Sequence, residues 1–288
     1  MAPLPQDPLQ KERRLLRKLA DNPTPDQIHH FRTNARRIEA VLDLVFDKPR
    51  KNERKLLKQL GRVRRRAGRV RDLDVQITTL QTLHLGREDQ CKRQVWRSLR
   101  AQRKKALKRL VESVDRRTIA RLQKRLSRTA QKLSPAKGNG NRPSFNPNSS
   151  DSSSPRTLTA RRLQKIQSRF PLSESTLHEY RLRCKRLRYT LELSKSSEAP
   201  EVLDQLKKIQ DSVGRWHDSV VLLGTAESII DHGGSCPLIS ALRNLSKAQL
   251  WQALEITRGV MAALVSTPVR KPAQQKPAAS TLATAASA

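Results

Sequence analysis

Apolar residues recur every three or four positions along most of the chain, which is the spacing of amphipathic helices. The pattern is clearest where the apolar positions advance by steps of 3, 4, 3, 4 and 3, at Ile28, Phe31, Ala35, Ile38, Leu42 and Val45. Pro25 lies near the start of this segment and Pro49 follows its end, as expected for a helix bounded by prolines. The sequence therefore predicts a helix that packs in a bundle.

The same periodicity continues downstream. A second stripe consists of Leu56, Leu60, Val63, Ala67, Val70 and Ile77. Two further periodic segments lie near residues 87–113 and 115–133, whereas strand signals are few throughout the chain. We therefore expect an all-α protein whose first part is an antiparallel bundle of four main helices.

Two segments have the composition of non-globular chain. Residues 134–156 are rich in Ser, Asn, Pro and Gly and have almost no apolar residues, which predicts a flexible linker or insertion. Residues 266–288 contain several prolines and no acidic residue, which predicts a disordered tail. These boundaries leave two helical domains, residues 9–133 and residues 157–265.

The two domains contain matching motifs. The segment HHFR, which begins at His29, is matched by HEYR, which begins at His178, 149 residues later. The segment GRVRD begins at Gly68 and is matched by GRWHD, which begins at Gly214, 146 residues later. The second half also has its own apolar stripe, at Leu177, Tyr180, Cys184, Leu187 and Leu191. Two motifs in the same order and at nearly the same separation indicate an internal duplication, with one bundle in each half.

The net charge of the chain indicates which class of partner it binds. The 288 residues include 59 Lys plus Arg against 26 Asp plus Glu, a formal net charge of +33. Such a charge attracts polyanions. No apolar run approaches the roughly 18–20 residues of a membrane span, and no apolar signal-peptide core follows the N-terminus. With three widely spaced cysteines that suggest reduced thiols, we expect a soluble cytoplasmic protein that makes no membrane contact.

Several basic residues share helix faces. His29, Arg32 and Arg36 follow i, i+3, i+7 spacing, and their counterparts from His178 onward do the same. Rows of cations on adjacent helices can follow a chain of phosphates, although a solvated basic face is the simpler alternative. The candidate polyanion-binding residues are His29, Arg32, Arg36, Arg37, Lys58, Arg62, Arg65, Arg69, His178, Arg181, Lys185, Arg186, Arg188, Lys207 and Lys208.

The remaining polar residues of the motifs suggest supporting roles. Asp72 and Asp218 are predicted to orient neighbouring arginines, and Gly68 and Gly214 to permit close helix approach. No cysteine–histidine cluster, HExxH motif or phosphate-binding glycine loop occurs in the sequence. Asp72 and Asp74 do not form an evident pair of carboxylates for general acid–base catalysis. We therefore expect no enzyme activity, cofactor or metal, while ligation of a metal by His29 together with His178 is a minor alternative.

The order of these motifs resembles CHAD domains, the conserved histidine α-helical domain family. The first half has HxxR followed by Arg36 and Arg37, and then GRVRDLDV over residues 68–75. The second half has LHEYRLRCKRLRYTLEL over residues 177–193 and IQDSVGRWHDSVVLL over residues 209–223. The resemblance extends over roughly residues 9–265.

The resemblance implies a fold and a ligand. It implies two four-helix bundles related by a pseudo-twofold axis, with basic helix faces lining a central groove or pore. It also implies non-catalytic binding of inorganic polyphosphate by the candidate residues, and association with polyphosphate granules. One position departs from the family: Glu39 stands where the second half has Arg188, so the first half is expected to contact fewer phosphates.

Two other functions remain open from the sequence. A nucleic-acid-binding protein could use the same basic surface through non-specific backbone contacts. Only nine residues are Phe, Trp or Tyr, however, which leaves few platforms for stacking bases. A polyphosphate or nucleotide hydrolase would need carboxylates clustered around a divalent metal, and only Asp72, Asp74 and Asp218 stand near the basic motifs.

Overall fold

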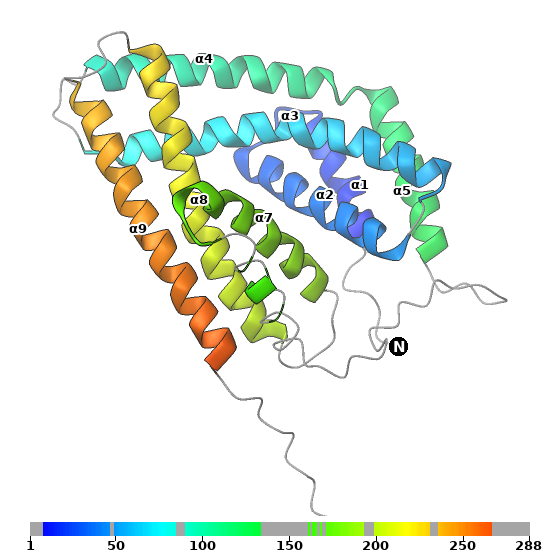
Figure 1. Cartoon of the computed structure of the whole chain (residues 1–288). Helices are drawn as coiled ribbons and strands as arrows, with labels where there is room; N and C mark the ends of the chain where they lie inside the picture. The colour runs from blue at the N-terminus through cyan, green and yellow to red at the C-terminus, as the bar shows by residue number, and fades with distance from the viewer. Residues whose placement is uncertain are drawn as a thin grey trace, which may run out of the picture.

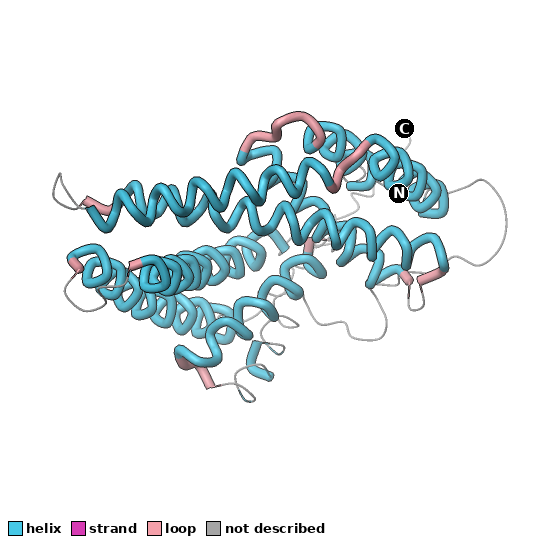
Figure 2. The backbone as a smooth tube through the Cα atoms, turned by 90° about the horizontal axis from the view of Figure 1, so that it is seen from above, coloured by secondary structure: helices cyan, strands magenta, loops and turns pink. Residues whose placement is uncertain are grey.

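The computed structural model describes residues 8–46, 49–84, 90–133, 161, 163–165, 168, 171–192, 199–230 and 236–266. In this part of the chain every regular element is a helix (Figures 1 and 2), which confirms the predicted all-α class. The helices are α1 (Pro8–Leu19), α2 (Pro25–Val45), α3 (Lys51–Thr82), α4 (Gln90–Glu112), α5 (Arg116–Leu133), α7 (Glu174–Leu191), α8 (Ala199–Ile229) and α9 (Pro237–Ser266). The predicted linker, residues 134–156, and the predicted tail beyond Ser266 lie outside the described residues.

The start of α2 is fixed by a capping box. The Thr24 side chain accepts a hydrogen bond of 3.3 Å from the backbone N–H of Gln27, and the Gln27 side chain accepts one of 3.0 Å from the backbone N–H of Thr24. Pro25 occupies the first turn, where its missing N–H costs nothing. The apolar stripe from Ile28 to Leu42 is buried, so Arg32 and Arg36 lie at the edge of the buried face.

A first hydrophobic core contains residues from each of the helices α1 through α5. The stripes predicted for α2 and α3 supply most of it, together with Val95, Leu99 and Leu110 of α4. Helix α1, which the sequence pattern did not single out, contributes four buried leucines. Within the described residues, no helix combines the length and apolarity that a membrane span requires.

A second core involves the second half of the chain. The whole predicted stripe of α7 is buried there, against the first part of α8 and the second part of α9. The two cores do not divide at the predicted linker, because Leu222 and Ala226 of α8 and Leu238 and Leu242 of α9 belong to the first core. The reason is length: α8 has 31 residues and α9 has 30, so both extend well beyond the 18 residues of α7.

The antiparallel pairs α2–α3 and α7–α8 pack against each other. Helix α2 contacts α7, and α3 contacts α8, as Figure 1 shows. The far end of α8 also meets α4, where the Gln94 side-chain amide donates a hydrogen bond of 3.2 Å to the backbone carbonyl of Ile229. This arrangement brings the His/Arg motifs of both halves, which lie on α2 and α7, to one region of the molecule.

Candidate functional site

Arg32 of α2 lies over Gly68 of α3. Its Nη1 donates to the Gly68 carbonyl at 3.4 Å and to Asp72 Oδ1 at 3.0 Å. The Arg32 side chain is 19% exposed and the Asp72 side chain 65% exposed. A Cβ built on Gly68 would lie 3.7 Å from the guanidinium. The glycine thus lies against the guanidinium of an arginine, at a distance where a Cβ would make an ordinary contact, and not against the backbone of a neighbouring helix.

The contact of an arginine with a glycine recurs between α7 and α8. The Arg181 guanidinium lies over Gly214, where a Cβ would be 3.4 Å from Nη2. Burial lowers the pKa of Arg181, and the negative charge of Asp218 opposes that shift. Burial also raises the pKa of Asp218, against the positive charge of Arg181. In the described part of the chain, the buried Nε of Arg181 has no hydrogen-bond partner.

Lys185 lies where the two halves meet. Burial, followed by the positive charges of four neighbouring arginines, lowers its pKa to about 7. Two of these arginines come from α2 and two from α7, and with Lys185 they form what we call the central basic cluster: Arg32, Arg36, Arg181, Lys185 and Arg188. Burial and positive neighbours thus both disfavour the charged form of Lys185, and a bound anion would oppose the effect of those neighbours.

A carboxylate at the end of α7 links the two halves at one side of the cluster. Glu192 Oε2 accepts a hydrogen bond of 3.1 Å from Arg37 Nε of α2, and Glu192 Oε1 lies 3.3 Å from Arg188 Nε of α7. Glu39, the residue that stands where the second half has Arg188, accepts a 2.8 Å hydrogen bond from Arg64 Nε. An ion pair thus stands in the first half where the second half has Arg188.

Histidines lie beside the cluster. The rings of His178 and His217 have centroids 4.8 Å apart, and those of His29 and His30 are 5.9 Å apart. Burial, followed by the charge of His178, lowers the pKa of His217. Burial, followed by the charge of Arg71, lowers the pKa of His29. Both shifts favour the neutral imidazole. Among the described residues, no group of three or more His, Cys, Asp or Glu could hold a metal ion.

Other predicted site residues lie away from the cluster. On α3, Lys58, Arg62, Arg65 and Arg69 are all exposed. Arg69 borders a cleft between α3 and α4. On α8, Lys207 and Lys208 are exposed, with the Lys208 ammonium 3.5 Å from Asp204 Oδ2. The side chain of Arg186 lies outside the described residues. The four cations predicted as one row along α3 therefore do not share one surface, because Arg69 borders this cleft while Arg65 lies beside Gly61, next to Glu39 of α2.

Sequence reasoning missed three residues that belong to the site. Arg71 acts electrostatically on His29 and on Asp218, and His217 occupies the matching position in the second half. The aligned motifs GRVRD and GRWHD already place these two residues three positions after a glycine, on the same helix face. Glu192 had no such signal, because its role depends on how α2 meets α7.

Comparisons with known proteins agree on one family. A family model described as "CHAD domain" matches residues 7–227. The crystal structure of the CHAD domain from the plant Ricinus communis is 21% identical to this chain, with a TM-score of 0.58, and the alignment covers 89% of this chain and 88% of that one. PptA from Streptomyces chartreusis is 16% identical, with a TM-score of 0.56, covering 89% and 94%. At these identities the two structures show a shared fold. No curated protein matches the chain.

Proposed function

The chain belongs to the CHAD domain family, and from that premise we propose that it binds inorganic polyphosphate, without cleaving it, at the central basic cluster. The observation that carries the proposal is the convergence of Arg32, Arg36 and Lys185 from two helices far apart in sequence. A phosphate chain in contact with these groups would relieve their mutual repulsion and accept their hydrogen bonds.

The matching arginine–glycine contacts of the two halves support the proposal of one groove that arose by duplication. Arg32 over Gly68 and Arg181 over Gly214 are equivalent contacts in the two halves. Each arginine has an aspartate four residues after its glycine, Asp72 in one half and Asp218 in the other. Asp72 accepts a hydrogen bond from Arg32 and keeps the donors of its fork oriented, so less side-chain entropy is lost when phosphate binds. We propose that the two bundles arose from one and that both line a single basic groove.

One contact supports the proposal that binding is not accompanied by catalysis. Asp72 accepts a hydrogen bond from Arg32, so its charge is already partly balanced by a cation of the protein. The proposed role is that of a binding module. By its affinity for the polymer it would bring the protein to polyphosphate granules.

A single preparation tests binding and catalysis together. The purified chain is mixed with long-chain polyphosphate and Mg²⁺, and orthophosphate release and thermal unfolding are followed. We expect no release above a protein-free control. At 100 times the dissociation constant, bound ligand adds about 2.7 kcal/mol, which raises the melting temperature by roughly 5–10 °C. Release that depends on Mg²⁺ and protein would show an enzyme, and an unchanged melting temperature at saturation would show that the polymer does not bind.

A further inference from the structure

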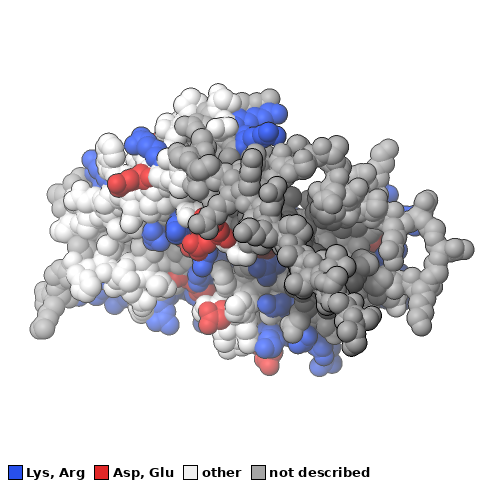
Figure 3. Space-filling view, turned by 90° about the horizontal axis from the view of Figure 1, so that it is seen from below, with Lys and Arg blue, Asp and Glu red and all other residues white. Residues whose placement is uncertain are grey.

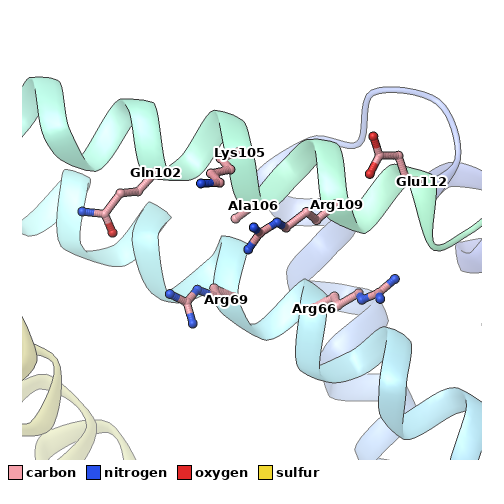
Figure 4. Close-up of a pocket in the computed structure, with 7 residues that line it drawn as sticks. All are labelled: Arg66, Arg69, Gln102, Lys105, Ala106, Arg109 and Glu112. Carbon is pink, nitrogen blue, oxygen red and sulfur yellow. The ribbon is translucent and has the colours of Figure 1, made fainter.

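A second basic cleft lies between α3 and α4, with a volume of about 760 Å³. Its lining residues are Arg66, Arg69, Gln102, Lys105, Ala106, Arg109 and Glu112. Figure 4 shows Arg109 extending from α4 toward α3, with Lys105 beside it on α4, whereas the guanidinium of Arg69 on α3 points away from α4. The cleft therefore offers cationic groups from two helices to whatever occupies it.

A small residue explains why two closely packed helices leave this space. The buried residues of α4 are Val95, Leu99, Ala106 and Leu110, and Ala106 has the smallest of these side chains. One turn before it, Arg103 forms an ion pair with Asp74 of α3. One turn after it, Leu110 is fully buried. The helices are thus held together on both sides of a position that no large side chain fills.

The charges of the cleft are less balanced than those of the central basic cluster. Four of its lining residues are cations and one is a carboxylate. That carboxylate, Glu112, lies 4.0 Å from Lys108 Nζ, on its own helix. Within the described part of the chain, Arg66, Arg69, Lys105 and Arg109 form no ion pair. By contrast, Arg32 has Asp72 as a partner in the central cluster. The cleft is thus suited to an anionic ligand that supplies the missing charge.

The cleft is separate from the central basic cluster. Gly68 faces Arg32 of α2, while the next residue, Arg69, borders the cleft. Successive residues of a helix are about 100° apart around its axis, so these two neighbours serve different surfaces. Figure 1 shows α2 and α4 on opposite sides of α3. A phosphate chain in the central cluster would have to pass around α3 to enter the cleft.

We propose that the α3–α4 cleft is a second polyphosphate-binding site, so that one molecule binds two separate stretches of phosphate chain and can cross-link them. The inference rests on the proposed function and extends it. Arg69 and Arg109 provide planar forks that match the oxygens of a phosphate group, and Lys105 adds a point charge. Cross-linking would make the protein a component that holds a polyphosphate assembly together.

The first test compares neighbouring lysines of one chain. Lys105 lines the cleft and Lys104 does not, although both are exposed. Acetylation by a lysine reagent is followed by mass spectrometry with and without inorganic tripolyphosphate. We expect Lys105 to be protected at least 5-fold and Lys104 less than 2-fold. Equal protection would overturn the site. Protection by duplex DNA and not by tripolyphosphate would assign the cleft to nucleic acid and overturn it too.

The second test counts sites by calorimetry with tripolyphosphate, which is too short to span both. The intact chain should bind two equivalents and Arg69→Gln/Arg109→Gln one. The control Arg93→Gln/Arg97→Gln removes the same charge from α4 outside the cleft and should keep two. Ala106→Leu fills the cleft without altering charge and should also leave one. Two equivalents in both cleft variants would overturn the inference.

The outcome for the cleft can be separated from that for the proposed function. Arg36→Gln/Lys185→Met neutralises the central basic cluster and should abolish the other equivalent. If this variant loses one equivalent and the cleft variants lose none, the proposed function stands and the second site is wrong. If the cleft variants lose an equivalent and Arg36→Gln/Lys185→Met loses none, the cluster is not the binding site and the proposed function fails.

Discussion

Reversing the charges of Arg36 and Lys185 together is expected to weaken binding of long-chain polyphosphate at the central basic cluster at least 100-fold. Hydrogen bonds to charged groups contribute about 1.5–3 kcal/mol each, and each 1.4 kcal/mol is a factor of ten in affinity. Losing two such contacts therefore reduces affinity by about 10²–10⁴, and two introduced carboxylates add repulsion. The measurement is a titration of Arg36→Glu/Lys185→Glu at about 0.15 M salt.

A matched control separates this effect from net charge. Lys247→Glu/Arg258→Glu makes the same change of charge at two exposed positions of α9. We expect that variant to bind within about 3-fold of the unaltered chain. If the two double variants lose affinity equally, the protein binds polyphosphate through its overall charge and the cluster has no special role. The milder Arg36→Gln/Lys185→Met introduces no new charge and covers the case in which the reversal disturbs folding.

The affinity for polyphosphate is expected to fall at least 10-fold between pH 7 and pH 9. In the free protein, burial and four arginines lower the pKa of Lys185 to about 7, so its charge is lost over this interval. Bound phosphates favour the charged ammonium and raise that pKa, so binding takes up a proton. Burial lowers the pKa of His29 and His217 below 6.5, so Lys185 is the group whose charge is expected to change most over this interval.

Calorimetry in buffers of different ionisation enthalpy measures the proton uptake directly, and we expect close to one proton per central site at pH 8. Lys185→Arg keeps a charge at every pH and should bind with nearly constant affinity. Proton uptake that persists in Lys185→Arg would show that another group is responsible.

Lys185→Met should bind weakly at both pH values. It should unfold at a higher temperature than the unaltered protein at pH 6, because the fold disfavours a charged lysine there and stability falls as pH drops toward 7.

Helical periodicity explains what could be predicted from the sequence. The stripe from Ile28 to Leu42 and the stripe from Leu177 to Leu191 are both buried, because residues three and four apart share one face of a helix. The matched glycines were visible as a repeat, and their contact with Arg32 and Arg181 gives that repeat a geometric meaning. All of this information is local to one or two helices.

Contacts between helices could not be predicted in the same way. Periodicity indicates which residues share a face but not which helix that face will meet. Arg69 belonged to a predicted basic row, yet it borders the α3–α4 cleft, while Arg71, outside that row, acts on His29. The meeting of Arg36 with Lys185 depends on α2 contacting α7, and the sharing of Glu192 by two arginines depends on the same contact. These features arise from tertiary packing alone.

A competition experiment tests the central claim most directly. Labelled long-chain polyphosphate bound to the protein is challenged with duplex DNA and RNA in phosphate-matched amounts, at about 0.05 M and about 0.2 M salt. Non-specific binding to phosphates weakens steeply over this range. If the shaped cluster recognises polyphosphate, the label stays bound at the higher salt against a large excess of nucleic acid. Displacement at equal phosphate concentration would contradict the account and show a general polycation.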